Sequence, residues 1–257
     1  MEVHHHSHTA DHDIHQGKKK WSHYFWEFLM LFLAVTLGFF VENKREHIVE
    51  NKRARQYASF LYDDLVKDTS SLLEGIDFMA TGIKKLDTLI LVLKSFDPAI
   101  SVPRVYALSG YAYSNPIFNP TMSTIEQLKN SGSLRYFHDK NLIQIFSKYD
   151  NDILILKTIE DRNAYLSEEM RKFLAQFLDL KKVNLPVVTD SARFTMHAFT
   201  VDINLKLYKN DPSQFEQFAN LCTLKQIDWS NRLARQSRIL ISMRNLTRSL
   251  KDEYHLE

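Results

Sequence analysis

Cysteine, glycine and proline are all scarce in this sequence, and each scarcity excludes some folds. The 257 residues include one cysteine, Cys222, together with six glycines and six prolines. A single cysteine excludes an intrachain disulfide and a zinc site made of cysteines. Sandwiches and barrels need a turn about every 8–12 residues, which this glycine and proline content does not supply. We therefore predict an all-α protein built from long helices.

Net charge is also nearly absent. Lysine and arginine number 33, and aspartate and glutamate number 31, so the formal net charge is +2. This balance gives no reason to expect a nucleic-acid partner, and we predict none. The hydrophobic fraction of 44% is high enough for one sizeable globular domain and too high for a disordered chain.

One long apolar run stands near the N-terminus. Residues 24–41 read YFWEFLMLFLAVTLGFFV, with Glu27 as their only charge. A helix of this length rises about 27 Å, close to the roughly 30 Å hydrocarbon core of a bilayer. A buried helix of a soluble protein would need a polar face, and a cleaved signal peptide would need a small-residue cleavage site. We predict a transmembrane helix over residues 21–42, with these residues in contact with lipid: Tyr24, Trp26, Leu29, Leu33, Ala34, Leu37, Gly38 and Val41.

The charges beside this helix leave its orientation open. Three contiguous lysines, residues 18–20, precede it directly, whereas five basic residues within fifteen positions follow it: Lys44, Arg45, Lys52, Arg53 and Arg55. A literal count of basic residues favours a cytoplasmic C-terminal side. The lysines, however, lie closer to the membrane and are not interleaved with glutamates.

Three segments together resemble a known kind of protein. They are FLMLFLAVTLGFFVENKREH (28–47), NPTMSTIEQLKNSGSLRYF (119–137) and KDEYHLE (251–257). These segments are similar to those of uncharacterised single-span membrane proteins of Bacteroidota-type bacteria. The resemblance implies an inner-membrane anchor with the bulk of the chain on one side, in the periplasm. It implies no activity and no catalytic residues.

After the span we predict an antiparallel helical bundle over residues 43–257. Its long helices are expected at about 43–96, 139–180 and 211–255, with Asp139 and Asp211 as N-caps of the last two. The first helix carries apolar residues at alternating steps of three and four, a coiled-coil-like seam that faces a neighbouring helix. The seam comprises Leu65, Leu72, Ile76, Ile83, Leu86, Ile90 and Leu93. We expect the lipid bilayer as one partner, and self-association through the seam or another membrane protein as a second.

Residues 97–120 contain four of the six prolines, and we predict a loop there. Its aromatic residues are candidates for lining a ligand pocket, the alternative being a cap over one end of the core: Tyr106, Tyr111, Tyr113 and Phe118. A short helix near 121–131 should follow, ended by Gly132. Residues 199–207 alternate apolar and polar side chains, which predicts a short β-hairpin near 183–208, or else an irregular helix.

Histidines crowd residues 1–20, a tail that we expect to be disordered. The imidazoles suited to a divalent transition metal are those of His4, His5, His6, His8, His12 and His15. A physiological metal site needs fixed geometry, which a short polar tail does not provide. Metal handling by the tail therefore stays an alternative hypothesis.

Basic residues dominate the last predicted helix: Lys225, Arg232, Arg235, Arg238, Arg244, Arg248 and Lys251. Contact with phosphate or anionic lipid is one interpretation. Pairing with acidic residues of the second long helix is the favoured one, and the candidates on that helix are Asp150, Asp152, Glu160, Asp161, Glu168 and Glu169. Exposed pairs of this kind would each contribute about 0–1 kcal/mol.

Glycine-rich phosphate loops and the HExxH and GxSxG motifs are absent from the sequence. We expect no enzyme activity and no cofactor. The favoured function is that of a membrane-anchored, non-catalytic helical interaction or scaffold protein, including a homo-oligomeric subunit of a membrane complex. An extracytoplasmic sensory domain that binds a small ligand is the alternative from another class.

Overall fold

The computed structural model describes residues 21–183, 186–188, 194–196 and 205–256. This part of the chain is almost wholly helical, as the composition predicts. Its helices are α1 (Trp21–Lys94), α2 (Pro98–Tyr113), α3 (Ser123–Asn130), α4 (Lys140–Phe177) and α5 (Pro212–Tyr254), with short 3-10 turns η1 (Ser133–Tyr136) and η2 (Leu180–Lys182). The chain divides into two compact units, residues 1–52 and 53–257.

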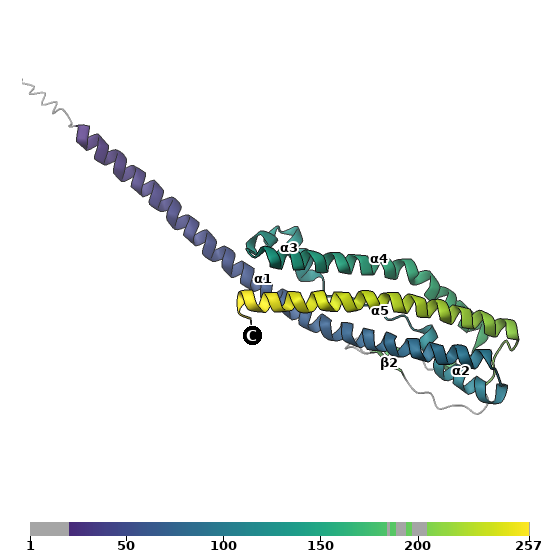
Figure 1. Cartoon of the computed structure of the whole chain (residues 1–257). Coiled ribbons are helices and arrows are strands. Elements are labelled where there is room, and N and C mark those ends of the chain that lie inside the picture. The colour runs from purple at the N-terminus through teal and green to yellow at the C-terminus, as the bar shows by residue number, and fades with distance from the viewer. Residues whose placement is uncertain (1–20, 184–185, 189–193, 197–204, 257) are drawn as a thin grey trace, which may run out of the picture. The chain divides into compact units, whose positions relative to one another are not determined.

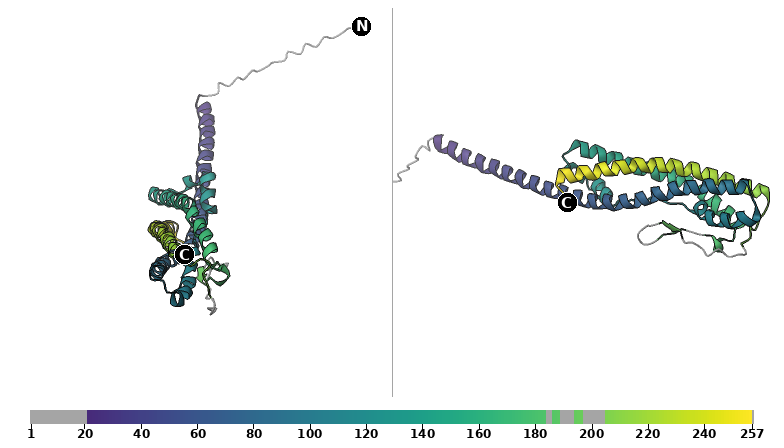
Figure 2. Two further views of the ribbon diagram at one scale, coloured as in Figure 1. Left: turned by 90° about the vertical axis from the view of Figure 1, so that its right-hand side faces the viewer. Right: turned by 60° about the horizontal axis from the view of Figure 1, so that its bottom comes forward.

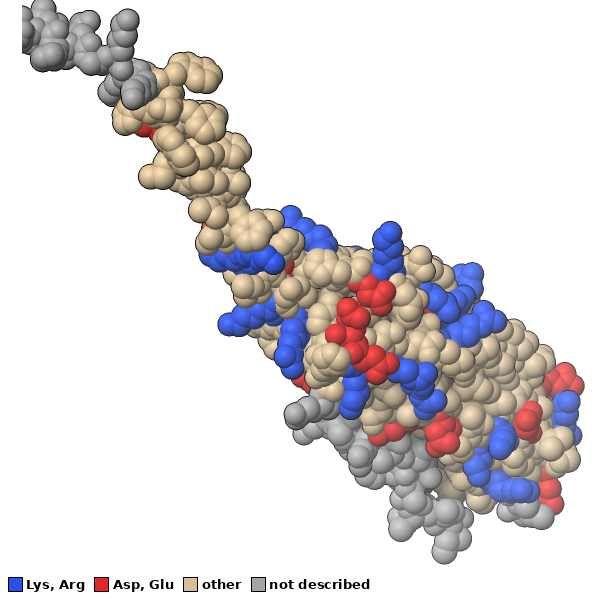
Figure 3. Space-filling model, turned by 60° about the vertical axis from the view of Figure 1, so that its left-hand side comes forward, with Lys and Arg blue, Asp and Glu red and all other residues tan. Residues whose placement is uncertain are grey.

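The described part of the first unit is the N-terminal portion of α1. Its apolar side chains are exposed: Phe28 is 65% exposed and Phe39 is 74% exposed. Figure 3 shows the N-terminal part of α1 as an almost entirely tan surface, with basic side chains farther along the helix. Among the described residues, α1 is the one helix long and apolar enough to cross a membrane, and none of its apolar window is buried within the chain.

In the second unit, the later part of α1 lies beside α4 and α5 (Figures 1 and 2). The core has two clusters. One joins residues 54–72 of α1 to the first half of α4 and the last turns of α5. The other joins residues 78–93 of α1 to α2, the end of α4 and the beginning of α5. Cys222 is fully enclosed in the second cluster, and burial raises the pKa of its thiol.

The seam of α1 is covered by helices of the same chain. Leu65, Leu72, Leu86 and Leu93 are buried, and three isoleucines pack against the clusters at their edges: Ile76, Ile83 and Ile90. Side chains of the same unit therefore cover most of the seam, as the predicted multi-helix bundle requires. Self-association through this seam would require the unit to open.

The loop predicted over residues 97–120 is wrong for most of its length, because residues 98–113 form α2. Pro98 occupies the first helical position, where the missing N–H removes no hydrogen bond. Pro103 lies inside the helix and costs about 3 kcal/mol there. Val105 and Ala112 are completely buried in the second cluster. Packing against distant helices therefore outweighs the proline penalty.

Local signals at the other helix ends are confirmed. The Asp139 carboxylate accepts a hydrogen bond from the Asn141 amide, and the Asp211 carboxylate caps α5 in the same way. Gly132 has a φ of 68°, the left-handed conformation expected after α3.

Residues 186–188 (β1) pair antiparallel with residues 194–196 (β2). Of the alternating segment, residues 199–204 lie outside the described residues, as does the histidine-rich tail.

At Gly82, α1 approaches α5 so closely that there is no room for a side chain. A Cβ atom at this position would overlap the ring of Trp229. We expect Gly82→Ala to lower the free energy of unfolding by about 1–3 kcal/mol, the usual cost of overpacking. Urea unfolding of the full chain in detergent, followed by circular dichroism, measures this change.

Gly75→Ala is the matched control on the same helix. A Cβ atom there would lie 3.8 Å from Gln236 Oε1, an ordinary contact. Alanine is the better helix former by about 1 kcal/mol, so this variant should be no less stable than the wild type. Equal stability of Gly82→Ala and the wild type would contradict the close approach.

Candidate functional site

A layer of polar residues lies between the two apolar clusters, where α4 and α5 meet. The contacts join Asp152 to Arg235, Glu160 to Arg232, Asn163 to Asp228, and Ser167 to Lys225. Residue numbers rise along α4 as they fall along α5. Several of these residues follow one another at steps of three and four along their helix, which is the spacing of an apolar seam. They therefore occupy positions where apolar side chains would be expected.

Arg232 is the centre of this layer. Its side chain is 2% exposed, and its Nη2 atom donates to Glu160 Oε1 over 3.1 Å. Its Nη1 atom donates to Asn115 Oδ1 over 2.9 Å, and Nη2 also donates to the carbonyl oxygen of Pro116. One guanidinium group thus joins α5 to α4 and to the connection between α2 and α3.

Pairing between basic residues of α5 and acidic residues of α4 was predicted, and it is confirmed for two pairs, Arg232 with Glu160 and Arg235 with Asp152. An exposed pair was expected, but the first pair is buried, since the Glu160 side chain is only 9% exposed. Burial raises the pKa of Glu160, and the Arg232 charge opposes this shift. Removing one partner of such a buried pair typically costs about 3–5 kcal/mol.

Lys225 is the second buried cation of the layer. Its side chain is completely enclosed, with Nζ at 3.3 Å from Ser167 Oγ and 5.5 Å from the centre of the Trp229 ring. Burial lowers the pKa of Lys225 to about 7, and the nearby Asp228 carboxylate opposes this effect. An amine that is largely neutral near physiological pH avoids most of the cost of burying a charge.

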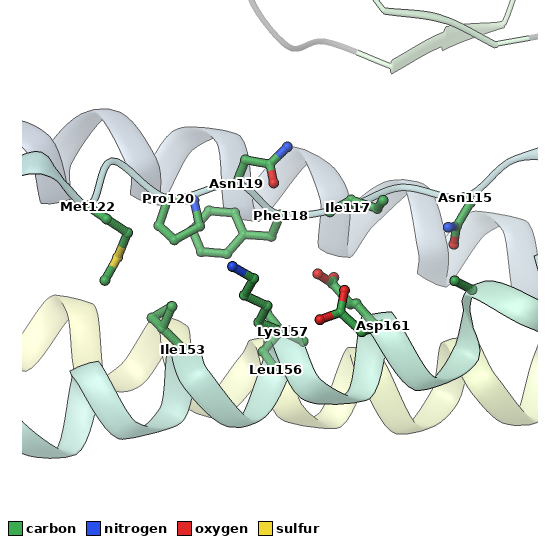
Figure 4. Close-up of a pocket in the computed structure, with 12 residues that line it drawn as sticks. Asn115, Ile117, Phe118, Asn119, Pro120, Met122, Ile153, Leu156, Lys157 and Asp161 are labelled. Atoms are coloured by element: carbon green, nitrogen blue, oxygen red, sulfur yellow. The ribbon is translucent and has the colours of Figure 1, made fainter.

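A cavity of about 420 Å³ opens beside this layer, between α4 and the connection that follows α2 (Figure 4). The connection contributes Asn115, Ile117, Phe118, Asn119, Pro120 and Met122. The facing side of α4 contributes Ile153, Leu156, Lys157, Glu160, Asp161 and Ala164. The cavity therefore combines an apolar wall with charged groups, and Glu160 links it to the buried Arg232.

Only one of the four aromatic candidates lines this cavity. Phe118 does, whereas Tyr106, Tyr111 and Tyr113 pack into or against the second cluster, which is the arrangement of a cap over the core. The Tyr106 hydroxyl donates to the carbonyl oxygen of Lys206 and accepts from the Asp179 amide. It fastens the end of α4 to the segment before α5. A role for these three tyrosines in binding a ligand stays a prediction.

Two contacts that hold the cavity wall were missed from the sequence. The Asp68 carboxylate accepts hydrogen bonds from the amide and hydroxyl of Thr121, and Asp64 accepts one from the Thr124 hydroxyl. Burial raises the pKa of Asp68 despite these bonds. The sequence did contain an indication of these contacts, because Asp68 lies close to the apolar seam and a buried charge requires a hydrogen-bonding partner.

Metal ligation remains a prediction for the tail alone. His4, His5, His6, His8, His12 and His15 lie outside the described residues. Among the residues that the structure does describe, there is no group of three or more His, Cys, Asp or Glu side chains placed to hold a metal ion.

Because Lys225 is buried, we predict that the free energy of unfolding rises with pH. Its pKa is about 7 in the folded chain, and an unfolded lysine has a pKa of about 10.4. Between these values the unfolded chain binds the extra proton, so the free energy of unfolding should increase by up to about 1.4 kcal/mol per pH unit. Below a pH of about 7 both states are protonated, and the cost of burying the charge is present in full.

Lys225→Met tests this dependence. The variant should show a flatter rise in alkaline solution and should exceed the wild type in stability at a pH of about 6, because it buries no charge. Urea unfolding over a pH series measures both effects. Lys251→Met, at an exposed lysine of the same helix, should keep the slope of the wild type, and identical slopes for all three proteins would refute the assignment.

No protein-family model, curated protein or solved structure matches this chain. The similarity of residues 28–47, 119–137 and 251–257 to single-span membrane proteins accordingly stays a prediction. The chemical character of the site comes from its own residues, which are the buried Arg232 with its acidic partner Glu160, the buried amine of Lys225 and an adjoining cavity.

Proposed function

We propose that this protein is a single-span, membrane-anchored helical protein that acts by binding partners rather than by catalysis. The observation that carries the proposal is the apolar stretch of α1, none of which is buried within the chain. Exposed apolar surface of this extent is rare on soluble proteins and marks a membrane or protein contact. Its length fits a bilayer core of roughly 30 Å, which makes lipid the better match.

For the second unit we propose an antiparallel helical bundle. Support comes from the contacts between α4 and α5, whose residue numbers run in opposite directions. The same holds between α1 and α5, because Gly75 lies near Gln236 and Gly82 lies near Trp229. Ion pairs within this bundle use the charges of Arg232 and Glu160 for internal support, a role suited to a rigid scaffold.

The proposed partner is another membrane protein or a second copy of this chain. Its contact surface would lie outside the seam of α1, because the seam is covered by α4 and α5. For location we propose the inner membrane of a bacterium with the helical unit in the periplasm, as the resemblance of residues 28–47 to single-span proteins implies.

Charges placed in the anchor should prevent insertion. An arginine at the centre of a membrane helix costs about 2.5–3.5 kcal/mol, so Leu33→Arg combined with Leu37→Arg should move the chain out of the membrane fraction. Ultracentrifugation of detergent-free lysate with a carbonate wash, followed by immunoblotting, measures the distribution.

Leu91→Arg provides the matched control on the same helix. Leu91 is 65% exposed in the second unit, so its replacement should leave the membrane fraction unchanged. A wild-type chain that stays folded in the supernatant would refute the anchor, whatever the variants do.

Protease added to spheroplasts tests the orientation separately. A periplasmic helical unit should be degraded while the inner membrane is intact, because the protease reaches that side only. A cytoplasmic protein in the same preparation should survive and serves as the control. Protection of the helical unit until the membrane is permeabilised would place it in the cytoplasm instead.

A further inference from the structure

We propose that the cavity beside α4 binds a small zwitterion with an apolar side chain, an α-amino acid of the leucine, methionine or phenylalanine type. This site goes beyond the anchoring and partner-binding function. The cavity of about 420 Å³ falls within the range of small-molecule pockets, roughly 300–1,000 Å³.

The lining of the cavity is ordered from apolar to charged. Figure 4 shows Met122 and Ile153 at one end, Asn115 and Asp161 toward the other, and Lys157 between them. Phe118 and Leu156 extend the apolar end and are buried in the first-described cluster of the core. A ligand seated here would place an apolar group at the first end and polar groups beside Lys157 and Asp161.

Two opposite charges are available to such a ligand. Lys157 and Asp161 lie one turn apart on α4 and are exposed, and within the described part of the chain neither makes an ion pair or hydrogen bond. A lysine that precedes an aspartate by four residues is the less favourable orientation for pairing along a helix. Glu160, by contrast, is already engaged by Arg232.

The sum of these charges selects the kind of ligand. The lining contains Lys157, Glu160 and Asp161, which sum to one negative charge. Arg232, which lies behind the lining, neutralises Glu160, so one positive and one negative charge remain for a ligand, those of Lys157 and Asp161. A purely anionic ligand would meet the Asp161 carboxylate, and a purely cationic one would meet the Lys157 ammonium. An α-amino acid satisfies both, because its carboxylate can pair with Lys157 while its ammonium group pairs with Asp161.

Titration calorimetry with the full chain in detergent tests the proposal. The probes are L-leucine, L-methionine and L-phenylalanine, each beside its N-acetyl and carboxamide derivatives. We expect saturable binding of at least one free amino acid and a loss of about tenfold or more in affinity for both derivatives, because each removes one charge-assisted hydrogen bond.

Substitutions locate the binding. Lys157→Gln and Asp161→Asn should each weaken it about tenfold or more, and both sites are exposed, so the fold should be kept. Lys148→Gln, at an exposed lysine of α4 outside the cavity, should leave the affinity unchanged. Absence of saturable binding, equal binding of the derivatives, or insensitivity to either of the first two substitutions would overturn the proposal. Membrane fractionation of the same protein reports on the anchor independently.

Discussion

Arg232 brings a permanent positive charge into the interior of the helical unit, where its side chain is 2% exposed. An unpaired charge at this depth would cost several kcal/mol, so the helices must meet where Glu160 neutralises it. Sliding α4 by seven residues would keep its apolar side chains on the same face but would set Ile153 or Ser167 opposite Arg232. The ion pair therefore selects one register from several that apolar burial alone would accept.

The same guanidinium group also shapes the cavity. It binds the Asn115 side chain and the Pro116 carbonyl oxygen, which fixes the beginning of the connection against α4. At the other end, Thr121 is held by Asp68 of α1. The stretch between these two fixed points bridges from one helix to another, and the space left beneath it is the cavity. A structural ion pair and a candidate binding site are thus parts of one arrangement.

Local signals were enough to predict the long helices α1, α4 and α5 and the N-caps of the last two. Asp139 and Asp211 cap helices because a cap needs only groups within three residues, and apolar periodicity needs no knowledge of a partner. Residues 97–120 were predicted wrongly because prolines indicate a break, whereas burial of α2 against distant helices decides its conformation. The cavity depends on which helix the connection meets, which no local pattern contains. The one indication in the sequence was that Glu160 and Arg232 occupy positions where the helical spacing calls for apolar residues.

Cys222 is the only thiol in the chain, and it is fully enclosed. Alkylating reagents attack exposed, ionised thiols, so the folded protein offers them no target in its native sequence. A cysteine introduced at any chosen surface position would consequently be the sole attachment point for a fluorophore or a nitroxide. Spectroscopy on the intact protein can then begin without first replacing a residue of the core.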